Sequence, residues 1–164
     1  MKYPLFIRAA NLSALATLAV ITTAGAQQPP IEFKAETLEL SQFPWTDEKR
    51  KPPGAPKPGI TTTYLRGSET ALAAYTVVYR FDPGARQPPH SHPDNRSCFV
   101  LSGTWLFGYG AKFDESQLKA LTAGSYYTEP SGMPHFASSI EGAIVECTSN
   151  GPSGVRFIDP ADGP

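Results

Sequence analysis

Residues 84–103 read GARQPPHSHPDNRSCFVLSG, and this stretch decides the fold. It holds two of the three histidines of the chain, His90 and His92, at positions i and i+2. On a β-strand that spacing turns both imidazoles toward the same face. Gly84 and Gly103 frame the pair. The stretch therefore predicts a strand that presents two nitrogen donors to one point.

A second stretch, residues 124–135, reads GSYYTEPSGMPH and ends on the third histidine, His135. Pro130 and Gly132 indicate a tight reversal, because proline presets φ and glycine accepts a positive φ. Neighbouring strands then bring three imidazoles together. Three neutral nitrogens around an open position suit one divalent transition metal, and Fe, Mn, Zn and Ni all stay open.

Both stretches follow the pattern of a known family. The first resembles cupin motif 1, G-x5-H-x-H-x3,4-E-x6-G, and the second resembles cupin motif 2, G-x5-P-x-G-x2-H-x3-N. The resemblance covers residues 84–139 and implies an all-β fold, the antiparallel cupin jelly-roll barrel (double-stranded β-helix). It also implies that His90, His92 and His135 are the metal ligands.

The first stretch departs from motif 1 where the family places its metal-binding glutamate, because Arg96 stands there. A guanidinium has no lone pair for a cation. One interpretation is a three-histidine site in which Arg96 faces a carboxylate or enolate of the substrate. The other is a barrel that has lost its metal and only binds a ligand. The three histidines favour the first.

A fourth ligand could come from Glu129 or Glu146, both in predicted strands of otherwise apolar or small residues. Strand alternation does not decide which of them faces inward. We predict Arg96 as an anion partner in catalysis, and a tyrosine or Glu129 as an acid or base. We expect either an enzyme (a dioxygenase, lyase or isomerase) or a non-catalytic module that binds a small molecule or a metal.

The rest of the chain predicts many short strands and one helix. A capping box at Asp114 and Gln117, with Phe113 and Leu118 as a hydrophobic staple, predicts a short helix near 114–121. Residues 44–59 hold five prolines and predict an irregular loop. The predicted strands span residues 31–40, 60–66, 73–81, 125–129, 134–140 and 143–148, with two more in 97–109 broken at Ser102 and Gly103.

The first 26 residues have the features of a secretory signal peptide. Lys2 and Arg8 are followed by an apolar stretch, residues 9–21, and by the small-x-small site Ala24-Gly25-Ala26. The apolar stretch is shorter than the ~20 residues that a membrane-spanning helix needs. We therefore predict a signal peptide at 1–26, an N-terminal strand and proline-rich loop at 27–59, and the barrel with an extended tail at 60–164. The protein is then periplasmic or secreted.

Composition limits the partners. The chain has 164 residues, a formal net charge of −1, 40% hydrophobic residues and 18% charged residues. Such a charge argues against nucleic acid, which needs a basic surface. We expect a small-molecule ligand and no membrane contact after signal cleavage, and a homodimer stays open.

Cys98 and Cys147 are the only cysteines. The cupin resemblance implies that the strands carrying them are neighbours in one sheet, and an exported protein meets oxidising conditions. We therefore predict a disulfide between them. Two small buried thiols are the alternative.

Overall fold

The computed structural model describes residues 35–45, 49–50 and 59–163. The predicted signal peptide lies outside these residues, as does most of the proline-rich loop. The strands are β1 (Lys49–Arg50), β2 (Ile60–Arg66), β3 (Ala74–Phe81), β4 (Arg86–Ser91), β5 (Arg96–Tyr109), β6 (Lys119–Thr122), β7 (Tyr126–Glu129), β8 (His135–Ser138), β9 (Ala143–Asn150) and β10 (Arg156–Phe157). Three short 3-10 turns are η1 (Leu40–Gln42), η2 (Glu115–Gln117) and η3 (Pro160–Asp162).

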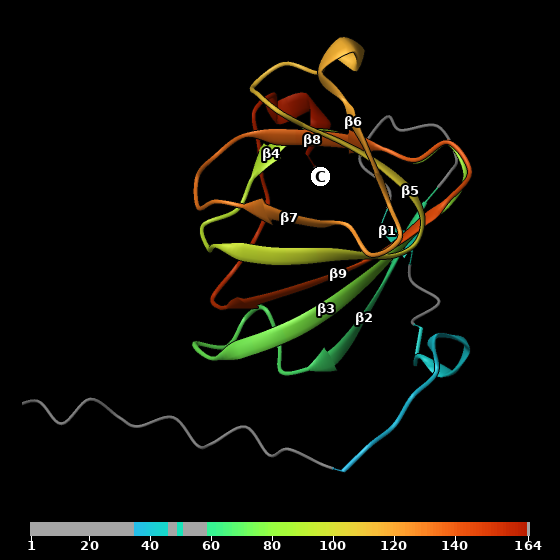
Figure 1. Ribbon diagram of the computed structural model, residues 1–164. Helices are drawn as coiled ribbons and strands as arrows, with labels where there is room; N and C mark the ends of the chain where they lie inside the picture. The colour runs from blue at the N-terminus through green and yellow to red at the C-terminus, as the bar shows by residue number, and fades with distance from the viewer. Residues whose placement is uncertain (1–34, 46–48, 51–58, 164) are drawn as a thin grey trace, which may run out of the picture.

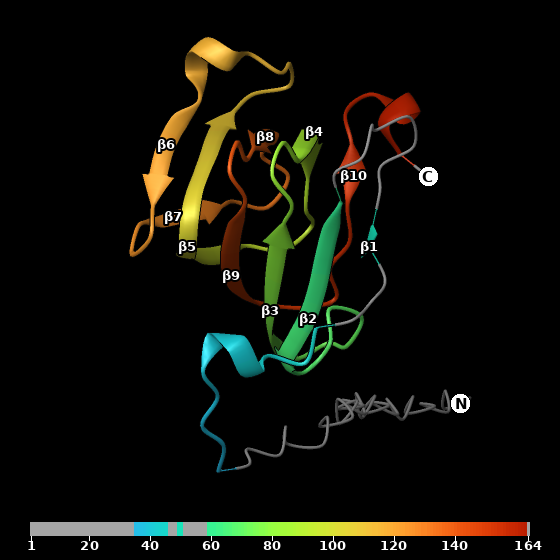
Figure 2. The ribbon, with the colours of Figure 1, turned by 90° about the vertical axis from the view of Figure 1, so that its right-hand side faces the viewer.

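The strands form two facing sheets that share β5 (Figures 1 and 2). One sheet runs β1-β2-β3-β9-β5-β7, and the other runs β10-β4-β8-β5-β6. Every pairing is antiparallel. The predicted all-β antiparallel jelly roll is confirmed. Among the described residues, no helix has the length and apolar character to cross a membrane.

Strand β5 passes from one sheet to the other near Gly103. Its first half pairs with β7 and β9, and the half after Gly103 pairs with β6 and β8. Gly103 has φ 74°, and a Cβ there would lie 2.2 Å from the carbonyl oxygen of Gly142. Only glycine fits such a position. Where the sequence predicts two strands, the chain makes one bent strand, because both halves find partners.

The predicted helix near 114–121 is wrong in length. Asp114 caps as predicted and accepts a hydrogen bond from the Ser116 N–H at 2.9 Å, but the turn ends at Gln117. From Lys119 the chain is strand β6, paired with β5. One capped turn does not offset the cost of helix nucleation, whereas the edge of β5 offers a full set of backbone partners.

The predicted strand at 31–40 is also wrong over its described part. Residues 35–39 carry no regular structure, and a 3-10 turn begins at Leu40. A segment with alternating apolar residues forms a strand only where the edge of a sheet offers it backbone hydrogen-bond partners. In the loop at 44–59, Lys49 and Arg50 form the short strand β1 against β2.

The predicted disulfide between Cys98 and Cys147 is confirmed. The two residues are register partners on β5 and β9, with Cα atoms 4.2 Å apart. Both side chains are buried inside the barrel. The bond joins two strands that are 49 residues apart in the chain.

The interior has two different ends. At one end Phe81 and Trp105 stack with ring centroids 4.1 Å apart, among Leu121, Ala143 and Val145. The buried polar side chains of the opposite end include Tyr75, His90, His92, Asp94, Arg96, Glu129, His135 and Ser149. The candidate site lies there.

Candidate metal centre

Two strand ends bring the three histidines together. His90 lies near the end of β4, His92 directly follows that strand, and His135 begins β8. His90 and His135 are register partners. The turn of the second motif packs on the first, since the Gly132 N–H donates to the carbonyl oxygen of His92 at 2.8 Å. One ring nitrogen from each of the three histidines lies within 4.8 Å of the others.

Each imidazole is held by a backbone carbonyl. His90 Nδ1 lies 2.7 Å from the oxygen of Pro88, His92 Nδ1 lies 2.7 Å from that of Gly154, and His135 Nδ1 lies 3.1 Å from that of Met133. A carbonyl oxygen only accepts, so each Nδ1 carries the proton. In the neutral ring each Nε2 therefore carries a lone pair, which is the tautomer that a metal ligand needs.

The protein environment keeps the imidazoles neutral. Burial, followed by the nearby His135, lowers the pKa of His90 to about 4. Burial and the charge of Arg96 lower the pKa of His92 to about 2. Burial lowers the pKa of His135 to about 4. At neutral pH no proton competes for the three Nε2 atoms.

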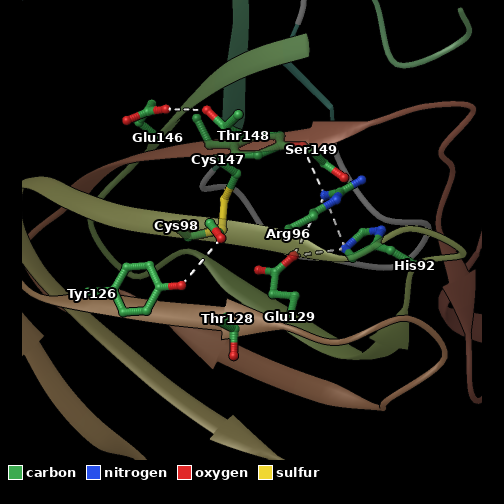
Figure 3. The surroundings of a disulfide bond; sticks show 12 residues. His92, Arg96, Cys98, Tyr126, Thr128, Glu129, Glu146, Cys147, Thr148 and Ser149 are labelled. Carbon is green, nitrogen blue, oxygen red and sulfur yellow. Dashed lines mark hydrogen bonds and ion pairs between the residues drawn. A yellow bond between two sulfur atoms is a disulfide. The ribbon is translucent and has the colours of Figure 1, made fainter. Parts of the chain in front are cut away.

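Glu129 enters the same space from β7 (Figure 3). Its Oε2 lies 3.4 Å from His92 Nε2 and 3.7 Å from His135 Nε2. Burial raises its pKa, and the charges of Arg96 and His90 oppose this. Glu146, the other candidate carboxylate, lies on the outer side of β9, where it accepts a hydrogen bond from Thr148 at 2.8 Å. The sequence left this choice open.

Arg96 points into the barrel, as predicted, and is 3% exposed. Its Nε lies 3.4 Å from Asp94, one terminal nitrogen donates to Ser153 at 2.6 Å, and the other donates to the Tyr79 hydroxyl at 3.2 Å. The nitrogen that bonds Tyr79 also lies 3.2 Å from His92 Nε2. Burial opposes the charge of Arg96, but Tyr79 and Glu129 raise its pKa above the ordinary value, so it stays charged.

Asp94 is the counterion of Arg96. It accepts hydrogen bonds from the hydroxyls of Tyr75, at 2.6 Å, and Ser153. Burial raises the pKa of Asp94, but the bonds from Ser153 and Tyr75 outweigh it and lower that pKa to about 2. Asp94 lies in the bend between β4 and β5, so strand alternation gave no signal for it in the sequence.

The C-terminal segment completes the site. Ser153 links Asp94 to Arg96, and Gly154 fixes His92. Beyond them, β10 pairs with β4, and Phe157 is the register partner of His90. No local pattern in the sequence indicated this contribution, because the segment reaches the site only by folding back across the barrel end.

The donor set fits a metal ion. Within the described part of the chain, Glu129 Oε2 and His135 Nε2 are buried and have no hydrogen-bond partner. Buried polar atoms are normally paired. Glu129 Oε2 has the Arg96 guanidinium at 3.7 Å as an ion-pair partner, and His135 Nε2, also at 3.7 Å, is a buried acceptor that a metal ion would pair. His90, His92 and His135 would hold the ion, with Glu129 beside them.

Comparisons with known proteins agree with this architecture. The ChrR cupin-like domain matches residues 35–153. Germin-like protein subfamily 1 member 4 of Arabidopsis thaliana is 30% identical over 92 residues, which cover 54% of this chain and 41% of that protein. The matched regions span 26% to 43% of the curated relatives.

Two solved structures share the fold. The polyketide cyclase RemF from Streptomyces resistomycificus superposes with a TM-score of 0.60 at 17% identity, covering 77% of this chain and 87% of that one. An RmlC-like cupin from Shewanella frigidimarina NCIMB 400 gives 0.53 at 20% identity, covering 71% and 91%. From its two motifs, its double-sheet barrel and a domain match over most of its length, the chain belongs to the ChrR cupin-like family.

Proposed function

We propose that the protein binds one divalent transition metal through His90, His92 and His135 and acts there on a small organic molecule. One observation carries the proposal: three buried imidazoles have their Nδ1 atoms fixed by carbonyls, and one ring nitrogen of each lies within 4.8 Å of the other two. Such preorganisation is typical of metal ligands held by outer hydrogen bonds.

When bound, the metal would polarise an oxygen of the substrate as a Lewis acid, and iron would add chemistry with O2. The side chains of this chain set the surroundings of the reacting group. The buried positive charge of Arg96 favours an anionic substrate group, a carboxylate or an enolate, and Glu129 is placed to accept or return a proton. We therefore favour a dioxygenase, lyase or isomerase reaction.

The anion-binding role of Arg96 has a structural condition. Among the described residues, its contacts with Asp94, Ser153 and Tyr79 already use most of its N–H groups. A substrate anion would take over the N–H that now faces His92 Nε2. Metal binding at His92 frees the same N–H, so metal and anion would bind together.

Export to the periplasm or the medium is part of the proposal. The disulfide between Cys98 and Cys147 supports it, because such bonds persist in oxidising compartments. The test is fractionation of the host cells, with mass spectrometry of the mature N-terminus. A protein retained in the cytoplasm with its first 26 residues would contradict export.

Metal analysis of protein purified from its own host tests the main proposal, because recombinant protein reports the metal that was supplied. We expect about one metal ion per chain, and loss of it in the His90→Ala, His92→Ala double variant. Protein loaded with Fe(II), Mn(II), Ni(II) or Zn(II) is then incubated with β-diketones, catechols and hydroxy acids. Oxygen uptake or substrate loss supports the enzyme, whereas tight binding without turnover selects a binding module.

A further inference from the structure

We propose that Glu129 is the carboxylate ligand of this metal centre, delivered from β7 in place of a residue at position 96 of β5, and that Arg96 is its paired cation. This inference rests on the proposed metal site and specifies its fourth ligand. The family motif places a glutamate at the position of Arg96 on β5, whereas in this chain the carboxylate is Glu129, on the neighbouring strand β7.

Strand register makes the exchange geometrically equivalent. Arg96 and Glu129 are direct partners on β5 and β7, and both side chains are buried on the inner face. Directly opposed residues of an antiparallel pair have Cβ atoms only about 5 Å apart. A carboxylate at either position therefore reaches the space beside His92 and His135, two members of the three-histidine cluster.

The distances around Glu129 match those between ligands of one ion. Its Oε2 lies 3.4 Å from His92 Nε2 and 3.7 Å from His135 Nε2. Two donors that each lie about 2.1 Å from a tetrahedral ion are about 3.4 Å apart. Both Nε2 atoms are acceptors, because the protons are on Nδ1. Three buried acceptors that face one another favour a cation between them, and Arg96 reaches only His92 and Glu129 of the three.

The charges around Arg96 are also consistent with a metal ion bound beside Glu129. Arg96 carries one positive charge against the carboxylates of Asp94 and Glu129. With neutral imidazoles and an ionised Glu129, the cluster has a net charge of −1, which favours a bound cation. Arg96 is anchored on Asp94 and Ser153, and the nitrogen that faces His92 already has Tyr79 as a second acceptor. It can release His92 to the metal and stay beside Glu129.

Titration with Co(II) tests the inference, because Co(II) absorption reports both affinity and the number of ligands. The proteins are the wild type, Glu129→Gln, and Glu146→Gln as the matched control on the outer side of β9. We expect Glu129→Gln to lower Co(II) affinity at least about tenfold and to change the visible spectrum. Glu146→Gln should match the wild type. An unchanged affinity and spectrum in Glu129→Gln would overturn the inference.

A charge-swapped variant, Arg96→Glu with Glu129→Arg, tests the exchange itself. We expect it to bind Co(II) more tightly than Glu129→Gln does. A swapped protein that melts cooperatively but binds no better would contradict the exchange. Glu129→Asp, which keeps the charge and shortens the reach, should fall between the wild type and Glu129→Gln, and serves if the swap does not fold.

Failure of the proposed metal site would look different. In that case the wild type would take up no Co(II), or the His90→Ala, His92→Ala double variant would bind it as well as the wild type. If the wild type and Glu129→Gln bind equally while the double histidine variant does not, the three-histidine site stands and only the ligand role of Glu129 fails.

Discussion

The two ends of the barrel interior are built from the same strands but are stabilised by different interactions. β3 carries Tyr75 at one end and Phe81 at the other, and β5 likewise carries Arg96 and Trp105. Around Trp105, apolar side chains need only shape and contact to be stable. Around Arg96, every buried polar atom needs a partner.

This difference shows where the fold gives up stability for chemistry. Residues at the Trp105 end could be exchanged for others of similar volume. At the Arg96 end the partners come from β3, β4, β5, β7, β9 and the C-terminal segment, and charged groups are buried together there. A buried polar network that needs so many specific partners is typical of a functional site.

The largest effect is expected at the apolar end. Trp105→Ala removes a fully buried ring that stacks on Phe81, and we expect it to lower the free energy of unfolding by about 3–5 kcal/mol. Co(II) affinity of the folded protein should stay near the wild-type value. Urea unfolding and Co(II) titration measure the two quantities. A tenfold loss of affinity with the fold intact would show that the two ends are coupled; Leu121→Ala is the milder substitute.

The disulfide belongs to the polar end, since its sulfur atoms lie within 4.8 Å of a Glu129 carboxylate oxygen. Replacing Cys98 and Cys147 together by alanine removes a link across 49 residues. The chain-entropy model sets an upper value of about 4 kcal/mol, and we expect a loss of about 2–4 kcal/mol. Urea unfolding with and without reductant measures it.

The controls for the disulfide are chemical. Reductant should shift the wild-type unfolding curve toward that of the double variant and leave the variant unchanged. Denatured wild-type protein prepared without reductant should show no free thiol. Identical unfolding curves for wild type and variant would contradict a stabilising bond.

Ser153 tests the contribution of the C-terminal segment. Ser153→Ala removes the hydroxyl that bonds both Asp94 and Arg96, and hydrogen bonds to charged groups contribute about 1.5–3 kcal/mol. We expect a loss of stability in that range and weaker Co(II) binding, because Gly154 next to it holds His92. Ser97→Ala, on the exposed side of β5, is the control and should change neither. If Ser153→Ala and Ser97→Ala have the same stability and Co(II) affinity, the C-terminal segment does not contribute to the site.

Lowering the pH should reduce the stability of the protein through the buried histidines at the polar end. The folded pKa values of His90, His92 and His135 lie below the unfolded value of 6.5, so below pH 6.5 the unfolded chain takes up more protons. Stability of metal-free protein should therefore fall as the pH drops from about 6.5 toward 4. Between pH 7 and 5.5 we expect about 1 kcal/mol for each histidine.

Glu129 offsets part of this loss, because burial raises its pKa and the folded chain takes up that proton first. Urea unfolding of chelated protein across this pH range measures the sum. The His90→Ala, His92→Ala variant should show a shallower pH dependence. A wild type equally stable at pH 7 and 5.5 would contradict the buried neutral histidines.

The pattern of residues was sufficient for the elements that depend on near neighbours. His90 and His92 share a face because of their spacing, and the Pro130–Gly132 reversal returns the chain to His135. The motif resemblance added the jelly roll and, with it, the disulfide. The helix near 114–121 and the described part of the strand at 31–40 were wrong for one reason: local propensity cannot say which sheet edge is free to pair.

The sequence by itself determined the three imidazoles and the arginine among them, because short-range spacing and turn residues encode these features, and its motif resemblance added the all-β barrel. Only the tertiary structure decided that Glu129 faces the histidines and Glu146 does not, and that Ser153 and Gly154 reach Arg96 and His92. Both depend on register between strands far apart in the chain. A shift of one residue in that register turns every side chain to the other face, and no local pattern carries that information.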